Sequence, residues 1–135
     1  MTEEQENTQF KRVLRTYKLQ AVENGKIPNA TIVLDKNAAY VTGLQLNSPN
    51  KSKLNFRGRI GVRLDKDELV PPDTNANIFV SSVSVPPRQR FYPVGDKAVT
   101  NGSLEIDFVD VDNAAAPFAG GYQVDIILEV LLHKD

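Results

Sequence analysis

The stretch that decides the fold is QVDIILEVLLH, residues 123–133. Apolar residues recur there at every second position, with polar residues between most of them. Successive side chains of a strand point to opposite faces, so this spacing places one apolar face on a sheet. The same spacing recurs in residues 60–64 and 104–108, which extends the prediction of β-structure along the chain. The residues that it predicts to be buried are Ile60, Val62, Leu64, Leu104, Ile106, Ile126, Leu128 and Val130.

The chain as a whole divides into about eight predicted strands, separated by turn residues and prolines. Proline cannot donate to a sheet ladder, so Pro49, Pro71-Pro72, Pro86-Pro87, Pro93 and Pro117 indicate strand ends, edges and loops. This pattern predicts an all-β protein, an antiparallel β-sandwich that forms a single jelly roll. The predicted strands are 12–22, 31–34, 40–47, 54–64, 77–85, 90–94, 98–100 running through the turn Asn101-Gly102 into 103–111, and 122–132.

Residues 10–22 fit two patterns. Phe10, Val13, Tyr17 and Ala21 have helical spacing, whereas the segment from Arg12 onward also suits a strand. We favour the strand because the following Asn24-Gly25 is a strong turn signal. Residues 1–9 are polar and acidic without periodicity, which predicts a flexible N-terminal arm before a single domain over residues 10–135.

The composition excludes several classes of function. The chain has 135 residues, enough for one domain, and it has no cysteine, so disulfides and thiolate sites are excluded. Its 16 basic and 17 acidic residues give a net charge of −1, which favours neither nucleic acid nor an anionic membrane as a partner. Residues 1–7 lack the pattern of a signal peptide, and no apolar run reaches membrane-spanning length. We expect synthesis in the cytoplasm, no nucleic-acid binding and no membrane insertion.

The chain offers few groups for catalysis. It has one histidine, His133, whereas a metal-dependent jelly-roll enzyme needs a cluster of histidines around its metal. A nucleophile–histidine arrangement would depend on the same residue, which the strand pattern places at a solvated strand end. We therefore expect no enzyme activity, no catalytic residue and no cofactor.

Two acidic clusters are the remaining candidates for chemistry. Asp107, Asp110, Asp112 and Asn113 supply oxygen ligands suited to Ca²⁺, but they lack the glycine and the distal glutamate of an EF-hand loop. We expect Asp107 to face solvent and the others to begin a loop, with no metal bound. The second cluster, residues 65–68, contains paired carboxylates like those of a glycosidase, but a charged turn between strands is the favoured interpretation.

Arginines provide candidate contacts between subunits. Arg57, Arg59 and Arg63 share one face of the predicted 54–64 strand, either as a solvated face or as guanidinium groups that pair with carboxylates of a neighbouring subunit. Gly58 and Gly61 in the same segment indicate a bulge or a close backbone approach. The full set of candidate subunit contacts is Glu3, Glu4, Glu6, Arg57, Arg59, Arg63, Arg88 and Arg90.

Four stretches together give the chain a familiar pattern: the acidic arm up to Phe10, residues 30–44, residues 83–91 and the closing apolar strand. In these the chain resembles small single jelly-roll virion proteins of icosahedral bacteriophages, in particular vertex and capsid-associated proteins. The resemblance implies a structural role in a symmetric shell, with the arm and loops in contact with other capsid proteins. It identifies no site residues.

The expected function is that of a non-enzymatic virion structural protein, a capsid vertex (penton) or capsid-associated component. Such a protein is made in the host cytoplasm, resides in the virion and assembles as a homo-oligomer such as a pentamer. The alternative is a small β-sandwich module that binds carbohydrate or protein. Its surface aromatics would be Tyr40, Tyr92, Phe118 and Tyr122.

Overall fold

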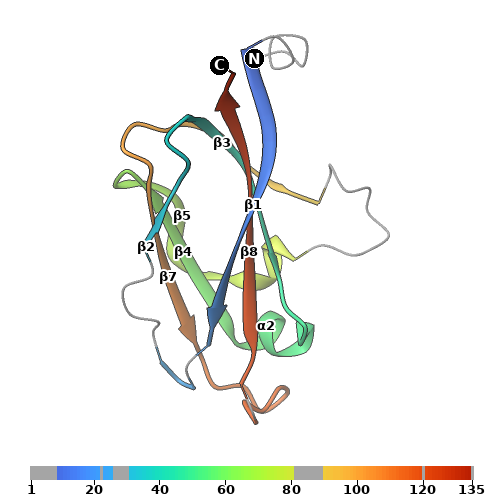
Figure 1. Cartoon of the computed structure of the whole chain (residues 1–135). Helices are drawn as coiled ribbons and strands as arrows, with labels where there is room; N and C mark the ends of the chain where they lie inside the picture. The colour runs from blue at the N-terminus through green and yellow to red at the C-terminus, as the bar shows by residue number, and fades with distance from the viewer. Residues whose placement is uncertain (1–8, 22, 26–30, 81–89, 120, 135) are drawn as a thin grey trace.

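The computed structural model describes residues 9–21, 23–25, 31–80, 90–119 and 121–134, and these form a sandwich of two antiparallel sheets (Figure 1). The first sheet has the order β1-β8-β3-β6 and the second the order β2-β7-β4-β5. The prediction of an all-β sandwich is confirmed. The strands of the first sheet are β1 (Phe10–Gln20), β8 (Gln123–His133), β3 (Ala38–Asn47) and β6 (Tyr92–Ala98). Those of the second are β2 (Thr31–Val33), β7 (Ser103–Asp110), β4 (Gly58–Leu64) and β5 (Asp67–Asn75).

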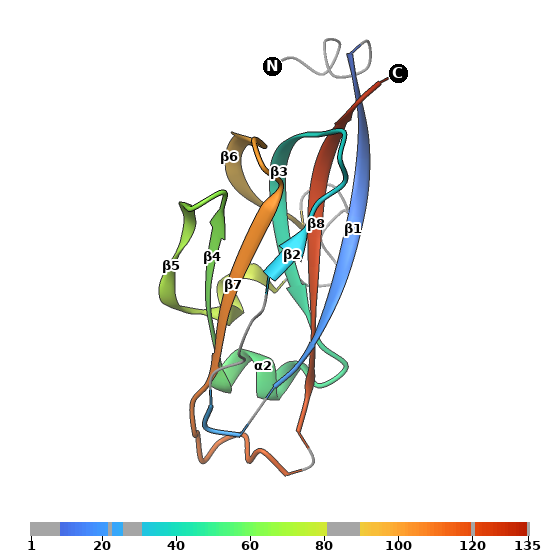
Figure 2. The ribbon, with the colours of Figure 1, turned by 60° about the vertical axis from the view of Figure 1, so that its left-hand side comes forward.

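The pairing of the strands is that of a jelly roll. The first strand pairs with the eighth, the second with the seventh, the third with the sixth and the fourth with the fifth. A long antiparallel hairpin that rolls up on itself produces this order, and the contacts β3–β8 and β4–β7 then complete the two sheets. Figure 2 shows the two layers edge-on, with β1 beside β8 at the margin of the molecule.

The core lies between the sheets and consists of the residues that the alternation predicts. Along β7 and β8, half-buried and buried residues alternate over eight successive positions in each strand. All eight residues predicted to be buried are at most 3% exposed. Burial of these apolar side chains provides most of the stabilisation of such a domain.

One predicted strand is partly a helix. Residues 54–64 were expected to be extended, but α2 (Lys51–Arg57) precedes the shorter strand β4. The side chain of Asn50 caps this helix by accepting a hydrogen bond from the N–H of Lys53, and Gly58 returns the chain to an extended conformation. Leu54 is buried while Phe56 is 56% exposed, which fits helical spacing and not a strand, where both would share a face.

The segment after β4 also departs from the prediction. Asp67 and Glu68 begin β5, which contains Pro71 and Pro72 and lies at the edge of its sheet, where a missing N–H leaves no partner unpaired. The predicted strand 77–85 is wrong over its first residues, because a short 3-10 helix, η1 (Ala76–Phe79), stands there. Residues 81–85 lie outside the described residues. The separate strands predicted at 90–94 and 98–100 are replaced by the single strand β6.

The two alternatives for residues 10–22 are resolved in favour of the strand. β1 runs over eleven residues and pairs with β8 along its whole length without a register shift. The predicted arm, apart from Gln9, lies outside the described residues. Within the described part of the chain, no helix is long and apolar enough to cross a membrane.

Candidate functional site

A buried charged cluster lies at one end of the sandwich, centred on Arg57. This residue ends α2, and Asp110 ends β7; they are 1% and 2% exposed. The Nε of Arg57 donates to Oδ1 of Asp110 at 2.9 Å, and its Nη2 donates to Oδ2 at 2.7 Å. Such a two-point contact between guanidinium and carboxylate is short, strong and fixed in orientation.

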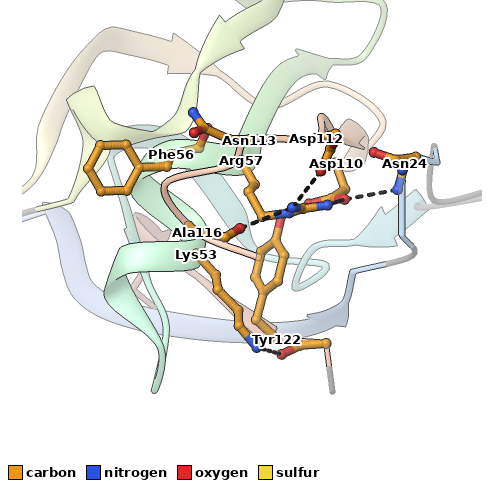
Figure 3. Close-up of polar contacts among 10 residues, drawn as sticks. Asn24, Lys53, Phe56, Arg57, Asp110, Asp112, Asn113, Ala116 and Tyr122 are labelled. Carbon is orange, nitrogen blue, oxygen red and sulfur yellow. Dashed lines mark hydrogen bonds and ion pairs between the residues drawn. The ribbon is translucent and has the colours of Figure 1, made fainter. Parts of the chain in front are cut away.

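The carboxylate of Asp110 accepts two further hydrogen bonds. The hydroxyl of Tyr122 donates to Oδ1 at 2.7 Å, and the backbone N–H of Asn24 donates to Oδ2 at 2.9 Å (Figure 3). Each carboxylate oxygen therefore has two donors. Protein donors therefore replace the water molecules that would bind the carboxylate of Asp110 in solution.

The rest of the guanidinium is also engaged. Nη1 of Arg57 donates to the carbonyl oxygen of Ala116 at 3.0 Å and to Oδ1 of Asp112 at 3.2 Å. The guanidinium carbon lies 5.3 Å from the centre of the Phe118 ring, within reach of a cation–π contact. The cluster thus joins four parts of the chain: the end of α2, the turn at Asn24, the end of β7 and the loop that leads to β8.

Two neighbouring contacts strengthen the same junction. Nζ of Lys53, on α2, donates to the carbonyl oxygens of Ala119 at 2.7 Å and Gly121 at 3.0 Å. Nδ2 of Asn113 donates to the carbonyl oxygen of Phe56 at 3.3 Å. Figure 3 shows Asn113 and Lys53 on opposite sides of Arg57. The helix and the loop that leads to β8 are therefore held together at both ends of their contact.

The environment shifts the pKa values of the cluster strongly. Burial alone would raise the pKa of Asp110, but the hydrogen bonds from Arg57, Tyr122 and the Asn24 N–H lower it overall. Burial, together with the hydrogen bond to Asp110, raises the pKa of Tyr122. The hydrogen bonds and charge of Asp110 outweigh burial at Arg57 and raise its pKa. The pair stays ionised and Tyr122 stays neutral near pH 7.

This geometry makes Arg57 an internal anchor and corrects its predicted position. The sequence placed Arg57 with Arg59 and Arg63 on one strand face, but the helix turns its side chain inward, where it is inaccessible to another subunit. Both carboxylate oxygens of Asp110 are engaged and buried, so the perturbed pKa values indicate a structural ion pair, since a catalytic group needs an accessible position beside its substrate.

Arg59 and Arg63 do share the outer face of the sheet β2-β7-β4-β5. Nη2 of Arg63 donates to Oε2 of Glu105 on the neighbouring β7 at 2.6 Å, and it lies 3.7 Å from Oδ2 of Asp107. Arg90 is half-buried and engaged in an interaction within the chain. The other candidate contacts, Glu3, Glu4, Glu6 and Arg88, lie outside the described residues.

The acidic cluster considered for Ca²⁺ is divided between two environments. Asp107 lies on the outer face of β7 beside Arg63, as expected, whereas Asp110 points inward to Arg57. The alternation of a strand separates them, so they cannot converge on one ion. No group of three potential metal ligands occurs in the part of the chain that the structure describes.

The acidic segment at 65–68 forms a turn at its first two residues. Asp65 and Lys66 have φ angles of 50° and 73° and connect β4 to β5. The carboxylate of Asp65 accepts hydrogen bonds from the N–H and hydroxyl of Thr100 at 2.8 and 3.0 Å and from the N–H of Ser103 at 3.0 Å. These bonds lower the pKa of Asp65 against the opposing effect of burial, and they tie the β4–β5 turn to the β6–β7 loop.

A small hollow adjoins this turn. Its volume is about 170 Å³, and it is lined by Asp65, Lys66, Asn101, Ser103 and Glu105. None of the described residues that line it is aromatic. Of the four aromatic residues considered for a binding surface, Tyr122 serves the buried cluster, while Tyr92 is exposed and packs against Phe79 with ring centres 5.1 Å apart.

His133 lies at the exposed end of β8. Its backbone N–H donates to the carbonyl oxygen of Asn37 at 2.8 Å, and its ring lies 5.4 Å from that of Phe10. Among the described residues no hydrogen bond joins its ring to a carboxylate or a hydroxyl.

Comparison with protein-family models, with curated proteins and with solved structures finds no match to the chain.

Proposed function

We propose that this chain is a non-enzymatic structural protein of a virion, a capsid vertex (penton) or capsid-associated component that assembles as a symmetric homo-oligomer. The observation that carries the proposal is the eight-stranded jelly roll that occupies the described chain from residue 10 to residue 133. Jelly rolls recur in viral capsid proteins, lectins and cupins. The fold alone does not separate these three classes, so the choice among them depends on particular residues.

The residues favour the capsid class over the cupin class. A metal-dependent cupin needs several histidines around its metal, and this chain has one, at the end of β8. The strongly perturbed groups Arg57, Asp110 and Tyr122 bind one another and their neighbours, not an open cavity. Rigid internal anchoring of this kind suits a subunit whose surfaces make the contacts with other molecules.

The accessible candidate contacts in the proposed assembly are Arg59 and Arg63 on the outer face of β4. Glu3, Glu4, Glu6, Arg88 and Arg90 remain candidates from the sequence, while Arg57 is removed from the set because it is buried. Arginine pairs well with carboxylates across an interface, and symmetry repeats each contact around a ring. Other capsid proteins are the expected further partners.

The second candidate function is that of a small carbohydrate- or protein-binding module. The observation that favours it is the polar hollow beside Asp65, whose lining offers amide, hydroxyl and carboxylate groups for hydrogen bonds with a small polar ligand. The absence of an aromatic residue from its lining weighs against a sugar ring, which usually stacks on one.

The solution mass of the purified protein, measured beside a glycan-binding screen, discriminates between the two functions. The capsid proposal predicts a discrete oligomer and no saturable glycan binding. A monomer that binds a glycan saturably would contradict the capsid proposal and support the binding module.

Removal of residues 1–8 should leave the melting temperature of the domain nearly unchanged but reduce incorporation into particles. Equal incorporation of truncated and full-length protein would remove the role of the arm.

A further inference from the structure

The four sheet edges of the sandwich are protected to different degrees. β2 has three residues; β5 contains Pro71 and Pro72 and has register shifts; β6 contains Pro93, and its pairing with β3 shifts register. Short strands, prolines, bulges and charged side chains are the usual means of blocking an edge against further pairing. Of these β1 has only charged side chains: it is eleven residues long, free of proline and regular in register.

The backbone groups that face the open edge of β1 follow from two cross-strand hydrogen bonds. The N–H of Ala21 donates to the carbonyl of Tyr122, and the N–H of Lys134 donates to the carbonyl of Gln9. Hydrogen-bonded and non-hydrogen-bonded pairs alternate along an antiparallel ladder, so the odd-numbered residues of β1 bond to β8. Leu14, Thr16 and Lys18 therefore direct their N–H groups away from the sheet.

This edge is accessible in the described structure. β1 pairs there with β8 alone, and Leu14, Thr16 and Lys18 are all exposed. The carbonyl of Leu14 accepts one hydrogen bond, from Nη1 of Arg15, and retains a second lone pair. Figure 2 shows β1 along the margin of the molecule, with β8 on one side of it.

The charge of β1 selects the kind of strand that can pair with it. The strand has four basic residues and no acidic one. Arg12 pairs with Glu129 and Arg15 with Asp35, but Lys11 and Lys18 form no ion pair with the described residues. A second β1 would bring four more positive charges and be repelled, whereas an acidic segment would be attracted.

The chain itself contains such a segment. Residues 1–8, MTEEQENT, have three glutamates, no lysine or arginine and no proline. Extended, eight residues span about 26 Å, so they can pair along most of β1, whose eleven residues span about 36 Å. We propose that the open edge of β1 binds residues 1–8 of a second copy of this chain as an added strand.

A second copy is favoured over the same chain because of connectivity. Residues 1–8 lead directly into Gln9 and β1, so they can lie along their own β1 only by reversing direction within themselves, which leaves about half of them for pairing. In the exchange between copies, each chain gives one arm and accepts one. Arranged head to tail, this contact closes into a ring when its rotation allows. The inference rests on the proposed homo-oligomer. It adds that residues 1–8 of each chain bind β1 of another copy.

Disulfide trapping in the full-length chain tests the proposal directly, because the protein has no cysteine of its own. Two single variants, Glu4→Cys and Thr16→Cys, are mixed and oxidised mildly. We expect a covalent dimer that contains one of each. The matched control is Val33→Cys, on β2 of the other sheet at a residue that is 80% exposed. A yield no higher than that of the control would overturn the proposal.

The double variant Glu4→Cys/Thr16→Cys separates pairing between copies from pairing within one chain. Exchange between copies predicts covalent oligomers, from a dimer upward. A monomer with an internal disulfide would overturn the proposal. Both readouts use purified protein and no virus particle. Absence of trapping in a protein that is still found in particles would therefore reject this inference alone.

Backbone and charge variants give independent measurements. Thr16→Pro removes one outward N–H without breaking a bond to β8, and Thr16→Ala retains it. We expect the proline variant to raise the concentration for half-maximal association at least about tenfold, and the alanine variant to change it less than about twofold. Replacing Glu3, Glu4 and Glu6 by glutamine should weaken association about tenfold at low salt and less at high salt. Unchanged association in the glutamine variant would overturn the role of charge in the proposal.

Discussion

Arg57 and Asp110 lie 53 residues apart in the chain and meet in the interior through two hydrogen bonds of 2.9 and 2.7 Å, with neither side chain exposed. Their pairing fixes the end of α2 against the end of β7. Because Tyr122 and the N–H of Asn24 share the same carboxylate, the junction also orients the start of β8 and a turn near the end of β1. The ion pair therefore links the helix, β7, the start of β8 and the turn at Asn24 at one end of the sandwich.

Replacement of Arg57 by methionine should destabilise the protein severely. The change keeps much of the side-chain volume but leaves the buried carboxylate of Asp110 without its counter-charge, which typically costs about 3–5 kcal/mol. Urea unfolding measures this loss. Arg63→Met is the matched control, because its ion pair with Glu105 is exposed and is worth about 1 kcal/mol or less. Equal losses in the two variants would contradict the anchoring role of Arg57.

Acid should destabilise the folded protein. The folded state lowers the pKa of Asp110 and of Asp65 below the ordinary value of 3.8, so the folded state binds fewer protons than the unfolded state in that range. The stability that these carboxylates contribute is complete above that value and is lost as the pH falls through their folded pKa values. Urea unfolding between pH 7 and pH 3 should show a decline that begins near pH 4 to 5. A free energy of unfolding that rises on acidification would contradict this assignment.

Gly61 should not tolerate alanine. A Cβ atom there would lie 2.7 Å from the Cα of Pro72, a backbone atom of β5 between the paired residues Val70 and Thr74. We expect Gly61→Ala to reduce the free energy of unfolding by about 1–3 kcal/mol, the usual effect of overpacking. The comparison is Gly95→Ala, where a Cβ meets no atom within 4 Å but the φ of +83° imposes backbone strain. A melting temperature unchanged by Gly61→Ala would show that β5 adapts.

The strands that sequence predicts well are those with one buried face. In β7 and β8 the alternation continues unbroken for eight residues or more, and it also contains the signal for the buried cluster. Asp110 continues the inward series of Leu104, Ile106 and Phe108, and Tyr122 precedes Val124 in the inward series of β8. A polar residue in phase with a core face implies a buried partner, and this signal was available. It does not identify Arg57, because the contact depends on folding across 53 residues.

The errors have local physical causes. The seven residues of α2 make two turns, too few to establish helical periodicity, and Leu54 and Phe56 continue the alternate spacing of Ile60 and Val62 into the helix. The spacing of Leu54 and Arg57, three residues apart, is the only sign that both face the core. β5 was missed because Pro71 and Pro72 argue against a strand, an argument that does not hold at a sheet edge.

Removal of divalent metal ions should leave the stability unchanged. Asp107 faces Arg63 outside the sandwich and Asp110 faces Arg57 inside it, so arginine supplies the positive charge that a metal would otherwise provide. Thermal unfolding in the presence of EDTA, and after addition of Ca²⁺, checks this prediction. A lower melting temperature in EDTA that Ca²⁺ restores would show that the loop after β7 binds an ion.

The most direct measurement of the proposed function is the protein content of purified virus particles. Particles of the virus that encodes this chain are separated on a density gradient, and the chain is quantified by mass spectrometry against the major shell protein. The proposal predicts that the chain sediments with intact particles in a fixed ratio that fits a symmetric set of shell positions. Its presence only in the soluble fraction, with none in particles, would contradict the proposal.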